Sequence, residues 1–465
     1  MRLRFIAAVS SIILIAFISD CSSVVEDDSI RKAPPQTVKI RRGEGGVSFK
    51  PIGQGVGGAF FSLAISPGDS NIILAGTDMG CMFRTEDGGK KWSFLGSEAS
   101  GDNPGFRGSW QAAFAPMNPD IAWASGEHGA YKSTDKGKTW KLMTAALGGG
   151  PNAYHALEID PNNSEVVYIS QGWAPQFFNG RGWSRGRVWK SLDGGKSWEE
   201  LKLMDTQKKI NHSFIVIDPG STVIERQGHS RVFVGGQNGL YVSENAGKAW
   251  AKVDTGIAGA NDDYNSLAVA QIDGHSVFFL SVHPRLLDKD TGAFVGGAYR
   301  SDDAGKSWKP LKVNDEKFMS MLASINSRGD GRGALCVLLR NCPAASKRLY
   351  LGSLMGIFRS DDAGETWGRV TNPAAEWQNF TDKDGSKGFF HLRRAGGNFL
   401  SSYNGAMDGL IEMAVAPSNP DVVVFNDYVT ITASIDGGKT WGDLTFDYDK
   451  PFDAGRFGDR PPMMY

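Results

Sequence analysis

The sequence predicts an all-β protein folded as a single seven-bladed β-propeller, with four antiparallel strands in each blade. Three observations predict this fold. One eight-residue motif recurs seven times along the 465 residues. The tryptophans that end successive copies lie 48 to 74 residues apart, from Trp92–Trp140 to Trp367–Trp441, which is the length of a blade. The 59 glycines indicate the many tight turns that short-stranded proteins need.

The motif reads Ser or Thr, any residue, Asp or Asn, any residue, Gly, two further residues and Trp. Its Asp can accept hydrogen bonds from backbone N–H groups of its own turn, and its Gly can adopt a positive φ without steric cost. This motif is identified as the Asp-box (BNR repeat), which implies a structural hairpin joining strands three and four, so we assign it no catalysis. The seven copies begin at Thr85, Ser133, Ser191, Ser243, Ser301, Ser360 and Ser434.

In most blades an apolar strand that ends in proline precedes the first turn, as in Leu63–Pro67 and Met413–Pro417. Counting strands gives seven inner strands but eight outer ones. Residues Ser48–Ile52 and Trp441–Leu444 compete for the outer edge of the last blade. One of the two is expected to close the ring, because closure removes an exposed strand edge.

The N-terminus predicts export. Residues 1–20 combine Arg2 and Arg4 with a short apolar run, as in a signal peptide. The segment Ile18–Cys21 resembles the bacterial lipobox, which implies lipidation of Cys21, although Asp20 stands where the family has a small residue. We therefore expect an outer-membrane or cell-surface lipoprotein, or otherwise a periplasmic or secreted protein. Residues 21–46 read as a flexible tether, 47–446 as the propeller and 447–465 as a C-terminal tail.

Charge and cysteine usage narrow the function. A formal net charge of −1 argues against nucleic acid as a partner and against an anionic membrane surface, leaving the lipid as the one membrane contact. No cofactor motif or zinc-ligand spacing is visible, so we expect no cofactor or metal, and we expect a monomer. Cys336 and Cys342 could pair in an oxidising compartment, but residues 337–339 between them are predicted to form a strand, so the pairing stays open.

The face opposite the repeat turns is the expected site. In a four-stranded antiparallel blade, the loop entering strand one and the loop joining strands two and three share that face, around a central depression. These loops collect carboxylates, imidazoles and aromatic rings, a mixture that suits carbohydrates because carboxylates do acid/base chemistry and rings stack on sugars. The substrate-binding candidates are Arg107, Trp110, His128, His155, Trp173, His212, Asp263, Tyr264, Asp408 and Tyr428.

The stretch Phe49–Leu95 resembles the opening of the xyloglucanase family, glycoside hydrolase family 74. The family's Thr-Asp-x-Gly-Gly-x-Tyr-Arg motif stands here as Thr77–Arg84, with Cys81 in place of a Gly. The resemblance implies that Asp78 is a catalytic carboxylate. The family uses two propellers, and its second carboxylate lies in a related motif of the second one. This chain has a single propeller and no second copy of the motif.

A hydrolase of this kind needs a second carboxylate from the same propeller. Glu127, one blade on, is the first choice, and Asp427, on the other side if the ring closes, is the second. One carboxyl would be held protonated and the other ionised. The substrate would be a plant or algal polysaccharide or oligosaccharide.

Three other functions remain open. A non-catalytic propeller that binds a glycan or a protein is the main alternative, because a fold does not imply chemistry. A polysaccharide lyase would use His and Tyr side chains. A sialidase needs three Arg around the sugar carboxylate and usually carries an Arg-Ile-Pro motif, which is missing here.

Overall fold

The computed structural model divides the chain into two units, residues 1–51 and residues 52–465. In the first unit, β1 (Lys39–Ile40) pairs with β2 (Val47–Ser48). The second unit holds all the larger sheets. The structure describes residues 39–40, 47–48, 60–77, 82–95, 109–126, 129–147, 154–171, 187–203, 211–237, 239–257, 264–286, 294–313, 338–343, 345–353, 356–370, 377–381, 387–391, 412–426, 431–440 and 442–443.

Within these residues the second unit contains seven four-stranded antiparallel sheets, which confirms the predicted blades. Each is built from consecutive chain. Blade one is β3 (Phe60–Ile65), β4 (Ile73–Thr77), β5 (Met82–Thr85) and β6 (Ser93–Leu95). Blade two is β7 (Ser109–Ala115), β8 (Asn118–Gly126), β9 (Gly129–Ser133) and β10 (Lys141–Leu142). Blade three is β11 (Tyr154–Asp160), β12 (Asn163–Gln171), β13 (Val188–Ser191) and β14 (Glu199–Leu201).

The remaining four blades repeat this order. Blade four is β15 (Asn211–Ile217), β18 (Val232–Gln237), β19 (Gly239–Ser243) and β20 (Ala251–Lys252). Blade five is β21 (Tyr264–Ile272), β22 (His275–Leu286), β23 (Phe294–Ser301) and β24 (Lys309–Pro310). Blade six is β25 (Leu338–Cys342), β26 (Ala345–Ser353), β27 (Gly356–Ser360) and β28 (Gly368–Arg369). Blade seven is β31 (Glu412–Ala416), β32 (Asn419–Asn426), β33 (Ile431–Ser434) and β34 (Gly442–Asp443).

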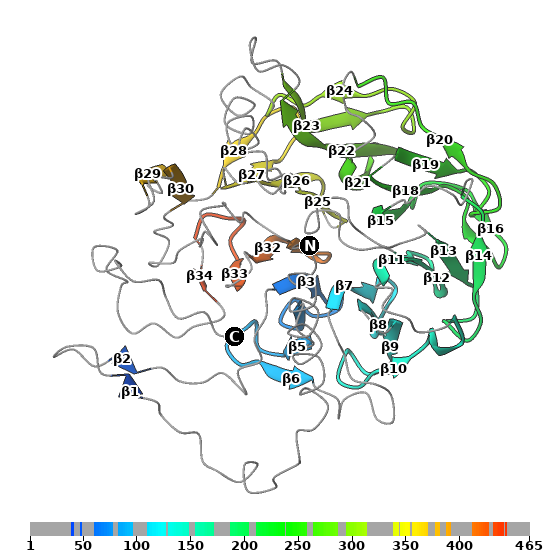
Figure 1. The fold of residues 1–465 in the computed structure, drawn as a ribbon, viewed down its shortest axis with the longest axis horizontal. Coiled ribbons are helices and arrows are strands. Elements are labelled where there is room, and N and C mark those ends of the chain that lie inside the picture. The colour runs from blue at the N-terminus through cyan, green and yellow to red at the C-terminus, as the bar shows by residue number, and fades with distance from the viewer. Residues whose placement is uncertain are drawn as a thin grey trace, which may run out of the picture. The chain divides into compact units, whose positions relative to one another are not determined.

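The blades stand in a closed ring with their first strands innermost (Figure 1). Each first strand contacts the first strand of the next blade, and β3 of blade one contacts β31 of blade seven. The buried core is divided into seven apolar clusters, one between each pair of neighbouring blades. Alternate side chains of a first strand enter different clusters: Leu63 faces blade seven and Ala64 faces blade two. Burial of these two-sided sheets therefore holds the ring together.

The repeat turns have the geometry that their residue types predict. In the fifth turn, Asp303 Oδ1 accepts the backbone N–H of Ser307 at 2.9 Å. Ser301 Oγ accepts the N–H of Gly305 at 2.9 Å and donates to Asp303 Oδ1 at 2.7 Å. The Trp308 ring N–H donates to the Gly305 carbonyl at 3.1 Å. The motif glycines all have φ between 79° and 91°. These four hydrogen bonds of the turn thus lie within eight residues of chain.

The C-terminal candidate forms the outer strand of blade seven. β34 pairs with β33, whereas Val47–Ser48 pairs with β1 in the first unit. Every blade therefore takes its four strands from one continuous segment. The ring closes where blade seven meets blade one, and among the described residues the two blades meet through packing of side chains without exchanging a strand.

Two further hairpins accompany the blades. β16 (Val223–Ile224) pairs with β17 (Gly228–His229), and β29 (Trp377–Thr381) pairs with β30 (Lys387–His391). His229 anchors the first of them, because its ring Nδ1 lies 2.9 Å from Asp160 Oδ2 of blade three and both side chains are buried. A short 3-10 helix covers Ala145–Leu147. No helix in the described ranges is long and apolar enough to cross a membrane.

Candidate functional site

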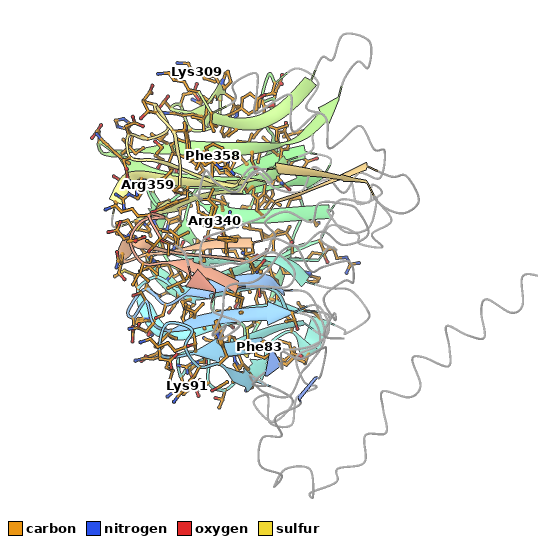
Figure 2. All side chains as sticks on the ribbon, turned by 90° about the vertical axis from the view of Figure 1, so that its left-hand side faces the viewer. Phe83, Lys91, Lys309, Arg340, Phe358 and Arg359 are labelled. Atoms are coloured by element: carbon orange, nitrogen blue, oxygen red, sulfur yellow. The ribbon has the colours of Figure 1, made fainter. Side chains whose placement is uncertain are left out.

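The register places the two expected sets of loops on one face. In blade one, Phe60 at the start of the first strand pairs with Thr77 at the end of the second. At the other end of the same sheet, Ile73 pairs with Thr85, which opens the repeat turn. The other blades follow the same pattern, so the repeat turns occupy the opposite face. Figure 2 shows Lys91 and Arg359, which belong to or adjoin repeat turns, on the same side of the propeller.

In blades one to five, the pairing between the first and second strands is irregular at the end of the first strand that reaches this face. The register shifts between Phe60 and Ser62 in blade one, and each of the next four blades has a shift at the same place. A β-bulge of this kind bends the strand and changes the direction of its side chains, and bulges are frequent beside binding sites. Four substrate-binding candidates lie within or directly beside these shifts: Trp110, His155, His212 and Tyr264.

In blades three and five, a backbone N–H group beside the bulge is satisfied by a side chain of the second strand. Ser170 Oγ accepts from the N–H of Ala156 at 3.3 Å, and Ser281 Oγ accepts from the N–H of Ser266 at 2.9 Å. A buried amide without a partner costs about 1–3 kcal/mol, so these small polar residues fix the bent strands in place. Sequence reasoning missed them, because a serine on an apolar strand carries no signal of its partner.

Other polar side chains at this level join neighbouring blades. Ser62 Oγ of blade one lies 3.2 Å from Ser109 Oγ of blade two, and both are buried. Gln111 Oε1 of blade two accepts the backbone N–H of Leu157 in blade three at 2.7 Å. These contacts connect the first strands whose ends carry the expected site. The sequence did not single out these residues, since their partners lie about one blade away in the chain.

Blades six and seven are joined by an ion pair. Arg340 Nη2 donates to Glu412 Oε1 at 2.5 Å, and Arg340 Nε donates to the carbonyl of Met413 at 3.0 Å. The backbone N–H of Glu412 donates to Oδ1 of Asn426, whose side chain is fully buried. The end of β32 is therefore supported by a charged network. None of these three side chains is among the site candidates predicted from the sequence.

Glu158 is an acidic residue on β11, the innermost strand of blade three. Its side chain is partly buried, and burial together with nearby Asp160 raises its pKa to about 8, with Arg340 acting in the opposite direction. This carboxyl is thus largely protonated at neutral pH. It lies three residues along the strand from His155, toward the face that carries the repeat turns.

Tyr264 is the one substrate-binding candidate whose side chain is described. It is 2% exposed, and its hydroxyl lies 3.0 Å from Thr255 Oγ1. Trp110, His155 and His212 are placed on β7, β11 and β15 by their backbone alone. No cluster of three or more His, Cys, Asp or Glu that could hold a metal occurs in the described parts of the chain.

The other predicted site residues lie outside the described residues. They comprise the three catalytic candidates, six remaining candidates for the site face and the lipidation site: Asp78, Glu127, Asp427, Arg107, His128, Trp173, Asp263, Asp408, Tyr428 and Cys21. Cys336 lies outside them too, whereas Cys342 is a buried thiol whose Sγ donates to the Ala416 carbonyl at 3.2 Å.

The described strands nevertheless fix which blades carry the three carboxylates. Asp78 directly follows β4 in blade one, Glu127 follows β8 in blade two, and Asp427 follows β32 in blade seven. Blade one contacts both other blades, through β3 with β7 and through β3 with β31. Both candidates for the second carboxylate therefore belong to the immediate neighbours of the blade that carries Asp78.

Sequence comparison supplies relatives for this propeller. A xyloglucanase from Hypocrea jecorina is 23% identical over 377 residues, covering 72% of this chain and 40% of the relative. A xyloglucanase from a Paenibacillus species is 22% identical over 357 residues, covering 70% of this chain and 32% of the relative. The chain is a distant homologue of the xyloglucanases. It spans well under half the length of these relatives.

Structure comparison agrees on the fold. The crystal structure of an ancestral enzyme of glycoside hydrolase family 74 matches with a TM-score of 0.50 and 14% identity, over 85% of this chain and 55% of the other. A family model described as sortilin, neurotensin receptor 3, matches residues 186–348, which span parts of blades three to six. The similarity to xyloglucanases extends over more of the chain than the sortilin match.

Proposed function

We propose that this protein is a glycoside hydrolase that cleaves a polysaccharide or oligosaccharide of the xyloglucan type. The observation that carries the proposal is the similarity to xyloglucanases over 72% of the chain. That similarity is joined by the family motif at Thr77–Arg84, in which Asp78 stands at the catalytic position. The β-bulges at the ends of the first strands, together with the polar side chains that hydrogen-bond beside them, would hold side chains of this face in fixed directions.

The mechanism that we propose uses paired carboxylates. Asp78 would act with Glu127 or with Asp427, one as general acid and the other as base or nucleophile. Both partners suit the ring, since each follows a second strand in a blade adjacent to blade one. A separation of about 5 Å between the carboxyls would retain the anomeric configuration, and about 6.5–9.5 Å would invert it. Product stereochemistry therefore reports the geometry of the pair.

A non-catalytic glycan- or protein-binding propeller is the second candidate. The observation that favours it is that the motif at Thr77–Arg84 has no second copy in this sequence, whose described residues form one propeller. By resemblance, the family places its second carboxylate in a second propeller. A single propeller could keep the sugar-binding face without the complete catalytic pair.

The test is hydrolysis of xyloglucan and a glycan panel by the chain from residue 22, followed by reducing-sugar release and product mass. Asp78→Asn, Glu127→Gln and Asp427→Asn are compared with Glu225→Gln, an exposed carboxylate on the β16–β17 hairpin. We expect Asp78→Asn and one of the other two site variants to lose activity by at least about a thousandfold, with Glu225→Gln unchanged. Turnover of no glycan, with binding of one that all four variants retain, would overturn the hydrolase proposal.

We also propose that the protein is exported and held at a membrane by a lipid on Cys21. Support comes from the basic and apolar residues 1–20 and from the lipobox-like Ile18–Cys21. A Cys21→Ser variant expressed in a Gram-negative host should lose incorporation of labelled palmitate and leave the membrane fraction. Wild-type protein that takes up no label and is recovered soluble would instead indicate plain secretion.

A further inference from the structure

Seven residues of the innermost strands, one from each blade, lie at the same level around the axis of the ring. Each pairs with a second-strand residue whose partner on the third strand directly precedes the Ser or Thr of the repeat turn. Two of the seven are charged, Glu158 in blade three and Arg340 in blade six. The other five are aliphatic: Ala64, Ala113, Val216, Ala268 and Ala414.

The two charged residues of this level belong to opposite sides of the ring. Figure 1 shows β11, which carries Glu158, and β25, which carries Arg340, on either side of the axis. Both side chains are partly exposed, whereas Leu157 and Ile159 beside Glu158 are buried. Burial and nearby Asp160 raise the pKa of Glu158 to about 8, and Arg340 acts in the opposite direction. The two groups therefore interact across the axis.

The two residues differ in the partners that they already have. Arg340 Nη2 donates to Glu412 Oε1 in blade seven at 2.5 Å, and Arg340 Nε donates to the Met413 carbonyl at 3.0 Å. Glu412 in turn donates its backbone N–H to Oδ1 of Asn426, the last residue of β32. The Glu158 carboxyl, by contrast, has no hydrogen bond or ion pair with another described residue. Arg340 is thus committed to Glu412, while Glu158 lacks a counter-ion in contact.

Few other groups surround Glu158. The strands packed against β11 are β7, β8, β12 and β15. Of the titratable side chains on these five strands, only Asp160 acts on the pKa of Glu158, and the cation that acts on it is Arg340. Besides Glu158 itself, the titratable residues on these strands are Tyr154, His155, Asp160, Asp120, Glu165, Tyr168 and His212.

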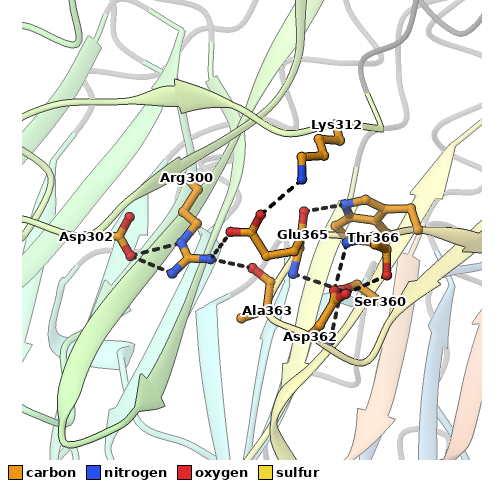
Figure 3. Close-up of polar contacts among 10 residues, drawn as sticks. Arg300, Asp302, Lys312, Ser360, Asp362, Ala363, Glu365 and Thr366 are labelled. Atoms are coloured by element: carbon orange, nitrogen blue, oxygen red, sulfur yellow. Dashed lines mark hydrogen bonds and ion pairs between the residues drawn. The ribbon is translucent and has the colours of Figure 1, made fainter.

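Another arginine of this protein already serves two carboxylates. Figure 3 shows Arg300 of blade five between Asp302, at 2.7 Å in its own blade, and Glu365, at 3.3 Å in blade six. The planar guanidinium has donors on both sides, so it can bind one carboxylate and remain within reach of a second. An arginine shared by carboxylates of two blades is therefore compatible with this fold.

We propose that Arg340 is a counter-ion shared by Glu412 and Glu158, and that the proton on Glu158 decides which of the two it binds. While Glu158 is protonated, Arg340 stays with Glu412 and joins blade six to blade seven. Once Glu158 has released its proton to solvent, its carboxylate attracts the guanidinium toward the axis, and the bond to Glu412 breaks. Proton loss then removes a support from Glu412, which holds Asn426 at the end of β32. The inference does not rest on the proposed function.

Crystal structures of the protein at about pH 6 and about pH 9.5 test the exchange directly. We expect Arg340 Nη2 on Glu412 at the lower pH, and the guanidinium within about 4 Å of the Glu158 carboxylate at the higher pH. Glu158→Gln should keep the pair of Arg340 with Glu412 at both values. The control Glu199→Gln, an exposed carboxylate on β14 of the same blade, should behave as wild type. An unchanged bond to Glu412 in the wild type at both values would overturn the proposal.

Double-mutant cycles give a second test in solution. Urea unfolding of Arg340→Met, Glu158→Gln and Glu412→Gln, alone and in pairs, measures the coupling of the arginine with each carboxylate. We expect the coupling with Glu158 to be absent near pH 6 and to change the unfolding equilibrium constant by about fivefold near pH 9.5. The coupling with Glu412 should show the reverse dependence. Coupling with Glu412 alone, equal at both pH values, would overturn the proposal.

Discussion

Arg359 Nη1 donates a hydrogen bond of 2.6 Å to the backbone carbonyl of Gly437, a residue 78 positions further along the chain. The same guanidinium pairs with Asp361 in its own turn at 2.9 Å. One side chain therefore connects two repeat turns that are far apart in the chain. Arg359 directly precedes the eight-residue motif that begins at Ser360, and its side chain adds a contact with the next blade.

Loss of the hydrogen bond from Arg359 to Gly437 should weaken the interface between blades six and seven. We expect Arg359→Met to lower the free energy of unfolding by about 1–2 kcal/mol, because a hydrogen bond to a charged group is lost while apolar bulk is kept. Urea denaturation followed by tryptophan fluorescence measures the change. Lys439→Met, an exposed lysine of the seventh turn, is the control, and an equal loss in both variants would contradict the assigned role.

Removal of the Ser301 hydroxyl, which belongs to the repeat motif, should lower the stability of the protein more than removal of the exposed Ser307 hydroxyl. Ser301→Ala leaves the buried N–H of Gly305 without its acceptor and should destabilise the protein by about 1–3 kcal/mol. Ser307→Ala removes only an exposed bond to Asp303 Oδ2 and serves as the control. Thermal unfolding of the two variants measures this difference. Equal melting midpoints would contradict the prediction.

The repeat turns should make the protein sensitive to acid. Hydrogen bonds from the Thr440 hydroxyl and N–H lower the pKa of Asp436 to about 2, and the pKa values of Asp303 and Asp362 are also about 2. A free Asp has a pKa of 3.8. The unfolded state therefore binds more protons in this window, so stability is lost as pH falls from about 4 to about 2.

The triple variant Asp303→Asn, Asp362→Asn and Asp436→Asn removes these titrations. The slope of unfolding free energy against pH near pH 3 should fall by up to about three protons relative to wild type. Urea unfolding at a series of pH values measures that slope. An unchanged slope would mean that these three carboxylates titrate alike in the folded and unfolded states.

Glu158 should act in the opposite direction at higher pH. Its folded pKa of about 8 lies above the free value of 4.5, so the folded state holds the extra proton between these values. Stability should therefore fall as pH rises from about 5 to about 8. Glu158→Gln, which cannot ionise, should match wild type at pH 5 and exceed it at pH 9, whereas the exposed control Glu225→Gln should follow wild type throughout.

The architecture could be predicted because its signals are local. Each repeat turn makes most of its hydrogen bonds within eight residues, so the spacing of Ser301, Asp303, Gly305 and Trp308 already contains the geometry. Seven such turns at blade-length intervals leave few other arrangements for the intervening strands. The face that carries the loops followed from antiparallel pairing alone, and the register agrees with it.

The supports of the candidate site could not be predicted, because their contacts join distant parts of the chain. Gln111 accepts from Leu157, 46 residues away, and Arg340 reaches Glu412, 72 residues away. Neither residue type signals its partner. The β-bulges beside Trp110 and His155 are equally silent in sequence, since an extra residue in a strand changes pairing without changing composition.

The sequence by itself determined the number of blades, the chemistry of the turns and the blades that carry Asp78, Glu127 and Asp427, because these depend on hydrogen bonds and alternation within short segments. Only the tertiary structure decided that Gly442–Asp443 forms the last outer strand and that cations such as Arg359 reach the repeat turn of the next blade. Those outcomes depend on which surfaces meet when the ring closes, and a linear pattern of residues does not specify that contact.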